Sequence, residues 1–268
     1  MTVAAPRTIP RLDEIVRLSR EIGAPHNDYV ILGEGNTSIR VGGDMLVKAS
    51  GVTMSTASAD DFVSVGIAEL LQIIADPVAG AADVDRVFGA VGQAHHGSRP
   101  SVEALLHAVC LELASVDVVG HTHPTAVTSI LCSENVGLLA QGSLFPDQIV
   151  VLGPAPLLIE YVDPGLTLAR VVKERLAAHV GEHGEAPKVI YLQNHGMFAL
   201  GRSAAEVLRI TAMAVKSARI MLAAASSGGV KFMPPGQVTR IHTRPDELYR
   251  RVRLEGDANP ANEGPIDG

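Results

Sequence analysis

The chain has 268 residues, of which 47% are hydrophobic and 3% aromatic, with no Trp, so aliphatic side chains are expected to fill its core. Its formal net charge of -7 argues against nonspecific binding to nucleic acid or to an anionic membrane, and favours a small-molecule partner. The cysteines Cys110 and Cys132 lack metal-ligand spacing, and the first residues lack the apolar segment of a signal peptide. These features predict a soluble, cytoplasmic protein.

The predicted elements of the first half begin with an amphipathic helix over 12–22, where apolar residues recur on one face. Residues 39–47 alternate apolar and polar side chains on either side of a Gly-Gly pair, which predicts a β-hairpin. Two further helices are expected over 60–75 and 101–114.

The second half alternates short branched segments with longer helical patterns. Helices are expected over 166–178 and 203–225, the second of which opens on a capping box of Ser203 and Glu206. Four short segments rich in branched residues and bounded by Gly and Pro are predicted strands: 116–123, 147–152, 156–162 and 188–196. Together these elements predict one sheet that is covered by helices on both faces.

The composition changes after Ser227. We expect one catalytic domain over 1–227 and a C-terminal extension over 228–268. The extension reads as a linker, a short helix and a mobile tail, over 228–237, 244–254 and 255–268 respectively.

Two histidines stand one residue apart in the predicted strand 116–123. Because successive side chains of a strand alternate in direction, His121 and His123 project to the same side and can reach one ion. Pro124 cannot continue the hydrogen-bond ladder, so the pair is predicted at the strand end. His195 ends the last predicted strand in the same way, and three histidines with an open position are typical of a catalytic zinc site. The alternative is that all three are core histidines that hold no metal.

Glu103 lies in the first turn of the predicted helix 101–114. A helix terminus and a nearby dication would both keep it ionised, which is the state that a proton-abstracting base requires. The alternative is a carboxylate that only stabilises the helix dipole. His107, one turn further, is expected to pack.

The stretch "LGEGNTS" resembles a dinucleotide-binding fingerprint, but Ser38 replaces the third glycine and a strand follows in place of a helix. We therefore exclude a nicotinamide site. Residues 36–38, read as a loop, and residues 48–51 can still present N–H groups and hydroxyls to a phosphate. The alternative is that both are ordinary turns.

The segment 179–183 reads "HVGEH", which matches a zinc-protease pattern. Gly181 lies inside it and Gly184 follows it, so a helix end is the expected structure.

Five motifs occur in one order along the chain: "GEGNTS", "KASG", "PSVE", "HTHP" and "LQNHG". In that order they resemble the class II aldolase and adducin family, from about residue 32 to residue 219. The middle region is similar to rhamnulose-phosphate and fuculose-phosphate aldolase-like proteins. The resemblance implies an α/β fold, a three-layer α/β/α sandwich with a central mixed, largely antiparallel sheet, assembled as a homotetramer.

The resemblance also implies a metal site and a reaction. A divalent ion, in the first place Zn, with Mn, Co, Fe or Mg as alternatives, would be held by His121, His123 and His195, and Glu103 would move protons. The phosphate of the substrate would be held by Asn36, Ser50, Gly51 and Ser101. The implied enzyme is a lyase that cleaves a phosphorylated ketose to glycerone phosphate and an aldehyde through a metal-stabilised enediolate. Two alternatives are an epimerase, dehydratase or decarboxylase that acts on a sugar phosphate or sugar acid, and a non-catalytic adducin-like module.

Two positions depart from the family pattern. Val102 stands where these aldolases often have a second serine, so one hydroxyl for the phosphate is missing. Gly142 stands where fuculose-phosphate aldolases have a tyrosine that donates a proton, and Tyr161 is a weak candidate to replace it.

Overall fold

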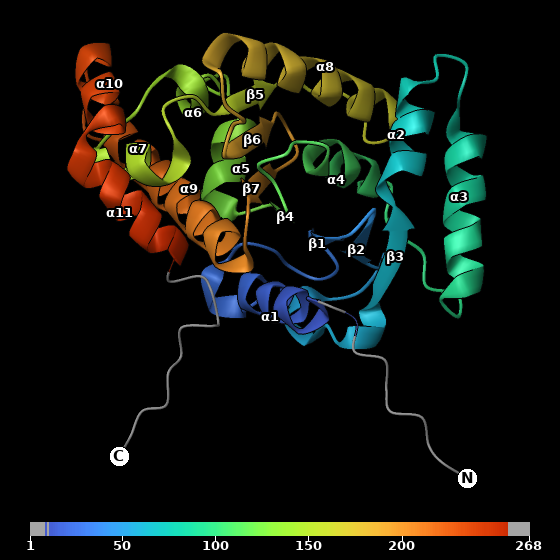
Figure 1. Ribbon diagram of the computed structural model, residues 1–268. Helices are drawn as coiled ribbons and strands as arrows, with labels where there is room; N and C mark the ends of the chain where they lie inside the picture. Colours follow the sequence, from blue (N-terminus) through green and yellow to red (C-terminus); the bar gives the residue numbers. More distant parts are fainter. Residues whose placement is uncertain (1–8, 10, 257–268) are drawn as a thin grey trace, which may run out of the picture.

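The centre of the protein is a seven-stranded sheet, shown in Figure 1, in a computed structural model that describes residue 9 and residues 11–256. The strand order is β3-β2-β1-β4-β7-β6-β5. The strands are β1 (Asn36–Val41), β2 (Asp44–Lys48), β3 (Phe62–Gly66), β4 (Val118–Thr122), β5 (Leu157–Ile159), β6 (Val189–Leu192) and β7 (Met197–Gly201). Every neighbouring pair is antiparallel except β5 and β6, which run parallel. The predicted mixed, largely antiparallel sheet is therefore confirmed.

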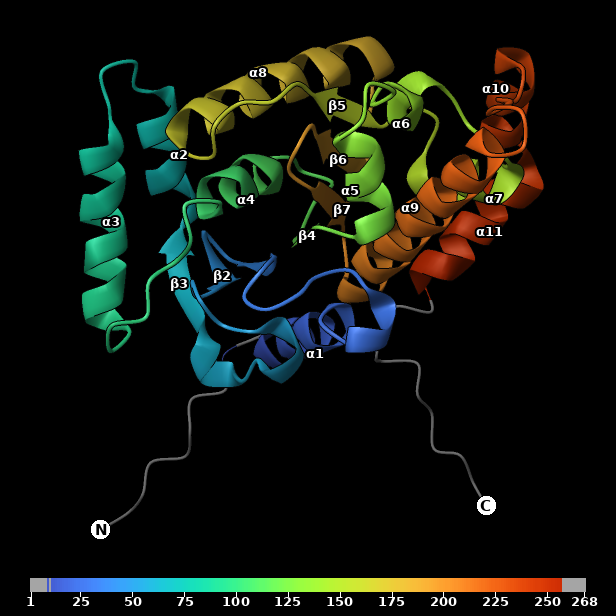
Figure 2. The same ribbon diagram turned by 180° about the vertical axis from the view of Figure 1, so that it is seen from behind.

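Helices cover both faces of the sheet, with α8 above it and α1 below it in Figures 1 and 2. One apolar layer is built with α2 (Ile67–Ala75), α3 (Ala81–Ala94), α4 (Ala104–Leu111) and α8 (Leu166–His183). The other is built with α1 (Leu12–Ile22), α5 (Thr125–Leu131), α6 (Leu138–Gln141), α7 (Pro146–Leu152) and α9 (Ala204–Ala225). None of the helices in the described part of the chain is long and apolar enough to cross a membrane.

Side-chain alternation along the strands feeds both layers. On β4, Val119 packs into the layer of α4 and α8, whereas Val118 packs into the layer of α1 and α9. Helix α4 is buried along its whole length, because it lies between the sheet and the helices α2 and α8. This position brings the beginning of α4 to the face of the sheet that carries Val119 and His121.

The segment 147–152, predicted as a strand, is the helix α7. In a segment of six residues, the periodicity of apolar side chains does not distinguish a buried helix from a strand. Pro146 occupies the first turn of α7, where its fixed φ favours the helix and its missing N–H costs nothing. The Gln148 side chain further accepts a hydrogen bond from the backbone N–H of Leu144, at 2.8 Å.

The helix predicted over 60–75 is wrong in its first part. Residues Phe62–Gly66 form β3, and only Ile67–Ala75 are helical. The β-branched and aromatic side chains of this segment pair with β2 at the edge of the sheet, a long-range contact that outweighs helical periodicity. Helix α3 was not predicted.

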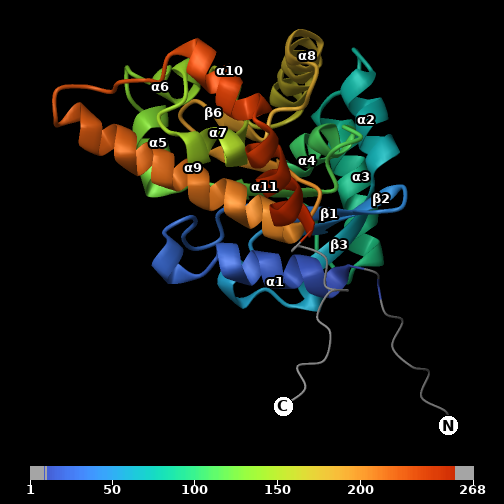
Figure 3. The same ribbon diagram turned by 60° about the vertical axis from the view of Figure 1, so that its left-hand side comes forward.

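The C-terminal extension is packed against α7 by α10 (Pro235–Thr243) and α11 (Pro245–Gly256), as Figure 3 shows. The short helix predicted over 244–254 is confirmed. The segment predicted as a linker, however, is bonded to the rest of the protein and is partly helical. The N–H of Met233 donates to the carbonyl of Ser143 at 2.8 Å, and α10 begins before the linker was expected to end. Of the predicted tail, residues 257–268 lie outside the described residues. The domain boundary at residue 227 stays a prediction.

Gly120 is the close contact point between β4 and the helices on one face of the sheet. A Cβ there would lie 2.7 Å from Cγ1 of Val207 and 3.3 Å from Cδ1 of Ile22. We expect Gly120→Ala to lower the free energy of unfolding by about 1–3 kcal/mol, the usual cost of overpacking. Gly89→Ala is the matched control, because a Cβ at Gly89 in α3 meets nothing within 4 Å. The control should gain about 0.5–1 kcal/mol from helix propensity in denaturant unfolding; equal effects of the two changes would contradict this packing.

Candidate metal centre

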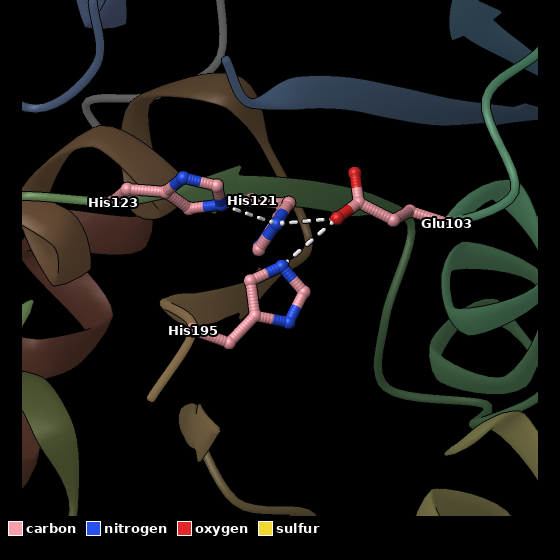
Figure 4. A group of neighbouring side chains, drawn as sticks. All are labelled: Glu103, His121, His123 and His195. Carbon is pink, nitrogen blue, oxygen red and sulfur yellow. Dashed lines mark hydrogen bonds and ion pairs between the residues drawn. The ribbon is translucent and has the colours of Figure 1, made fainter. Parts of the chain in front are cut away.

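Four side chains converge at one end of the central strands, as Figure 4 shows. The ligand atoms of Glu103, His121, His123 and His195 all lie within 4.8 Å of one another. Oε1 of Glu103 lies 3.1 Å from Nε2 of His121 and 3.0 Å from Nε2 of His195. Nε2 of His123 lies 2.9 Å from Nε2 of His121. The sequence-predicted ligands and the predicted base are therefore brought together.

The register of β1, β4 and β7 fixes the position of His121. Its Cα is paired with that of Asn36 on one side and with that of Phe198 on the other. The Phe198 ring stacks on the imidazole with ring centroids 4.2 Å apart. Strand β4 ends at Thr122, one residue earlier than predicted, so the pair lies at the strand end as expected and His123 follows the last residue of the ladder. His121 is fully buried, whereas His123 keeps access to solvent.

His195 enters the cluster from the tight turn between β6 and β7. Asn194 has a left-handed φ of 55° in this turn. At Gly196, a Cβ would lie 2.4 Å from Cδ2 of His123 and 2.5 Å from the carbonyl of Thr122. Glycine is therefore required for the turn to approach β4 and deliver His195.

A hydrogen bond orients the His121 imidazole so that its Nε2 atom faces the centre of the cluster. Nδ1 of His121 donates to the carbonyl of Met197 at 3.0 Å, which leaves Nε2 with its lone pair. Nδ1 of His123 lies 3.8 Å from Oε1 of Glu34. Burial lowers the pKa of His123 to about 3, with further lowering by His121 and His195, so it is neutral and able to ligate at neutral pH.

The four atoms fit a divalent cation. Three nitrogen lone pairs and a carboxylate oxygen repel one another unless a cation or protons lie between them. Their nearest separations of 2.9, 3.0 and 3.1 Å, with all four atoms within 4.8 Å of one another, are of the size expected for atoms that gather around one ion. Histidine nitrogen with carboxylate oxygen suits zinc and also other first-row divalent ions.

Glu103 is held ionised inside this cluster. Burial alone would raise the pKa of its carboxyl group. Positive charge at His121 and His195, carried either by protons on their Nε2 atoms or by a cation held in their place, outweighs burial and holds the pKa of Glu103 well below its usual range. The side chain keeps 16% of its exposure, so a substrate can reach it.

Residues 36–38, predicted as a loop, instead form the beginning of β1, and phosphate binding by Asn36 stays a prediction. Their backbone groups pair with β2 and β4, and Thr37 and Ser38 are buried, bonded to Ser19 and His107. Asn36 alone borders the cluster: Nδ2 donates to Oε2 of Glu103 at 2.7 Å and to Oγ of Ser101 at 3.3 Å.

The remaining predicted phosphate residues lie together beside the start of α4. The N–H of Ser50 donates to the carbonyl of Arg99 at 2.8 Å, which joins the loop to the segment that carries Ser101. Gly51 has a φ of +80° with open space at its Cβ position. Both Ser50 and Gly51 are exposed.

Lys48 shapes this loop from beneath. Its buried Nζ donates to the carbonyls of Ala49 at 3.2 Å and Val52 at 2.6 Å. Burial lowers the pKa of Lys48 to about 8, against the opposing charges of Glu103 and Asp61. The ammonium group therefore remains mostly charged at neutral pH and holds both ends of the exposed turn.

A cavity of about 400 Å³ opens beside His123 and His195, on the side of the histidines that faces away from the turn of Ser50 and Gly51. Its polar lining includes Asp28, Glu34, Thr125, Thr128, Ser129, His123 and His195. Sequence reasoning missed this cavity, because Asp28 and Glu34 reach it from an irregular segment without any motif spacing. It also missed the contacts of His107, for which the spacing of four residues from Glu103 was the available signal.

Other sequence candidates lie outside the cluster. Tyr161 is 54% exposed and its hydroxyl donates to Asp163 at 2.8 Å. The "HVGEH" segment is the end of α8, which Gly184 terminates with a left-handed φ of 75°, as predicted.

Comparisons with known proteins support the family resemblance of the sequence motifs. The family described as "Class II Aldolase and Adducin N-terminal domain" matches residues 13–222. The chain is 29% identical over 202 residues to the uncharacterized oxidoreductase YuxG of Bacillus subtilis strain 168; the alignment covers 72% of this chain but 27% of YuxG, so the chain spans about a quarter of that protein.

Two solved structures share the fold at low identity. An L-fuculose 1-phosphate aldolase superposes with a TM-score of 0.65 at 17% identity, over 91% of this chain and 97% of its own. YgbL from Escherichia coli, for which aldolase, epimerase or decarboxylase activity is suggested, superposes with a TM-score of 0.62 at 17% identity, over 87% of this chain and 97% of its own. The fold is thus shared, and because the family match spans most of the sequence, the chain belongs to the class II aldolase and adducin family.

Proposed function

We propose that the protein is a divalent-metal-dependent aldolase that cleaves a phosphorylated ketose to glycerone phosphate and an aldehyde. The observation that carries the proposal is the convergence of three histidine Nε2 atoms and one ionised carboxylate in a single accessible cluster. A divalent ion, zinc in the first place, held by His121, His123 and His195 would supply a Lewis acid for the negative charge that develops on the ketose oxygen. A cytoplasmic homotetramer is part of the same proposal.

Glu103 is the proposed proton-transfer group. In the cleavage direction the ionised Glu103 carboxylate takes up the proton of the hydroxyl on the carbon that becomes the aldehyde, the bond between the two carbons breaks, and its electron pair stays on the carbon next to the carbonyl. Glu103 then delivers a proton to that carbon, and it removes the same proton in the synthetic direction. Its depressed pKa keeps the carboxylate ionised, which is the state from which it accepts a proton in the synthetic direction.

The phosphate end of the substrate is proposed to lie against the exposed turn of Ser50 and Gly51, beside Ser101. The hydroxyls of Ser50 and Ser101 are suitable donors to an anion. The charged Lys48 beneath the turn adds positive potential without reaching solvent. Val102, where a second hydroxyl was expected, is 41% exposed and offers no donor.

The cavity on the far side of the histidines favours an uncharged aldehyde end. Asp28 and Glu34 line it together with the hydroxyls of Thr125 and Ser129. A substrate carboxylate would meet two acidic side chains there, whereas sugar hydroxyls can donate to them. This supports a sugar phosphate over a sugar acid.

The product assay decides between the aldolase and its alternatives. When phosphorylated ketoses are supplied with the metal-loaded protein, we expect glycerone phosphate to form together with an aldehyde. An epimerase, dehydratase or decarboxylase would use the same cluster but yield an epimer, a dehydrated ketone or carbon dioxide. Any of these products in place of glycerone phosphate would overturn the aldolase, and a protein that binds no divalent ion would support the adducin-like module.

Substitution of a metal ligand and substitution of the proton-transfer group should have different effects on metal content and turnover. We expect His121→Ala to lose most of its metal in elemental analysis, because one of three nitrogen ligands is gone. Glu103→Gln should keep near-normal metal, with turnover lower by about a hundredfold or more, because an amide does not accept a proton. His179→Ala, in the "HVGEH" segment, should keep both properties. If His121→Ala retained full metal and activity, the histidine cluster would not be a metal centre.

The phosphate cradle can be tested by single hydroxyl deletions. We expect Ser50→Ala and Ser101→Ala each to raise KM for the phosphorylated ketose by about tenfold or more, because a hydrogen bond to a charged group is worth about 1.5–3 kcal/mol. Metal content should not change. Thr53→Ala, an exposed residue nearby, is the control. An unchanged KM in both serine variants would place the phosphate elsewhere.

A further inference from the structure

A buried chain of hydrogen bonds runs from the interior of the protein to Glu103. His107 follows Glu103 by one turn at the beginning of α4, and Ser38 follows Asn36 by two residues on β1, so each pair lies on one face of its element. Oγ of Ser38 lies 2.6 Å from Nδ1 of His107, and Nε2 of His107 bonds to Oδ1 of Asn36. Nδ2 of Asn36 then donates to Oε2 of Glu103 at 2.7 Å.

Chemistry allows one direction for this chain. An ionised carboxylate only accepts hydrogen bonds, so the amide NH₂ of Asn36 must face Glu103 and its carbonyl oxygen must face His107. His107 therefore donates from Nε2 and accepts at Nδ1 from the Ser38 hydroxyl. Burial lowers the pKa of His107 to about 3, which agrees with the single proton that this chain requires.

Because of this chain of hydrogen bonds, the two oxygens of Glu103 make different contacts. Oε2 is tied to Asn36, whereas Oε1 faces the Nε2 atoms of His121 and His195. Rotation of the carboxylate would break the bond to Asn36. The amide of Asn36 cannot turn either, because its oxygen is held by His107.

His107 lies in apolar surroundings, where packing alone does not require a polar side chain. The residue is completely buried, α4 is apolar around it, and the Phe198 ring lies 5.4 Å away, centroid to centroid. A leucine would fill such a site without any polar group to satisfy. A histidine with both nitrogens bonded is tolerated, but it adds orientation that an apolar side chain does not supply.

We propose that His107 is a positioning residue, which acts through Asn36 to fix the Glu103 carboxylate with Oε1 toward the histidine cluster. The inference rests on the proposed role of Glu103 in proton transfer. It gives one N–H of the Asn36 amide to Glu103, while the same nitrogen also lies 3.3 Å from Oγ of Ser101. Loss of the chain should therefore lower kcat and leave KM for the phosphorylated ketose nearly unchanged.

The test compares two replacements of His107 in the full-length, metal-loaded protein. His107→Leu removes the donor to Asn36, whereas His107→Gln places an amide N–H near the position of Nε2. We expect His107→Leu to lower kcat by about tenfold to a hundredfold, the scale of a misplacement of about 1 Å, with KM within about threefold of the parent. His107→Gln should recover most of kcat, and both variants should keep near-normal metal.

Leu111→Ala separates positioning from stability. Leu111 is a fully buried residue of α4. This variant should lower Tm and leave kcat within about twofold. The proposal is overturned if His107→Leu keeps the parental kcat, if His107→Gln is no better than His107→Leu, or if kcat falls only in step with lost metal.

A structural measurement keeps the test independent of the reaction. In crystal structures of the metal-free parent and of His107→Leu, we expect the contact between Asn36 and Oε2 of Glu103 to be present in the first and lost in the second. Retention of that contact in His107→Leu would also overturn the proposal. If the parent itself cleaved no phosphorylated ketose, the proposed function would fail while this comparison still decided the role of His107.

Discussion

The antiparallel register of β1, β4 and β7 is the constraint on which the rest of the structure depends. It sets Asn36, His121 and Phe198 side by side at one level of the sheet. Because strand side chains alternate, a slip of one residue would send His121 to the opposite face, into the layer of α1 and α9. The tight turn that carries His195 leads directly into β7, and the pairing of β7 with β4 is part of the same register. His195 therefore meets His121, which is distant in the sequence, without a flexible connection.

Helix α4 completes the site by placing Glu103 against the strands that carry Asn36 and His121. Its burial between the sheet and α8 is driven by apolar contacts along its whole length, and those contacts hold its first turn against β1 and β4. Glu103 is therefore placed by a packed core, with Asn36 and His107 as polar links through it. A site supported by strands and a buried helix is held more rigidly than one carried by loops.

The two sides of the cluster differ in origin and in chemistry. His121 lies on β4, and His123, His195 and Glu103 lie at the ends of β4, β6 and α4, whereas the exposed turn of Ser50 and Gly51 and the cavity with Asp28 and Glu34 come from irregular segments. Solved structures at 17% identity share the fold, which supports a common scaffold but carries no substrate assignment. The proposed specificity therefore rests on the acidic cavity and the turn.

The sequence by itself determined the features that depend on local spacing. Period 3.6 placed α1, α8 and α9, the Gly-Gly pair placed the hairpin, and the His-x-His spacing put His121 and His123 on one side. Tertiary structure alone decided the features that depend on distant partners. Strand β3 exists because β2 pairs with it, α7 is helical although its residues are compatible with a strand, and residues 36–38 are a buried strand because two neighbours take up their backbone groups. The partners of His107 and the lining of the acidic cavity were hidden for the same reason, because hydrogen bonds and cavities join residues whose separation along the chain carries no periodic signal.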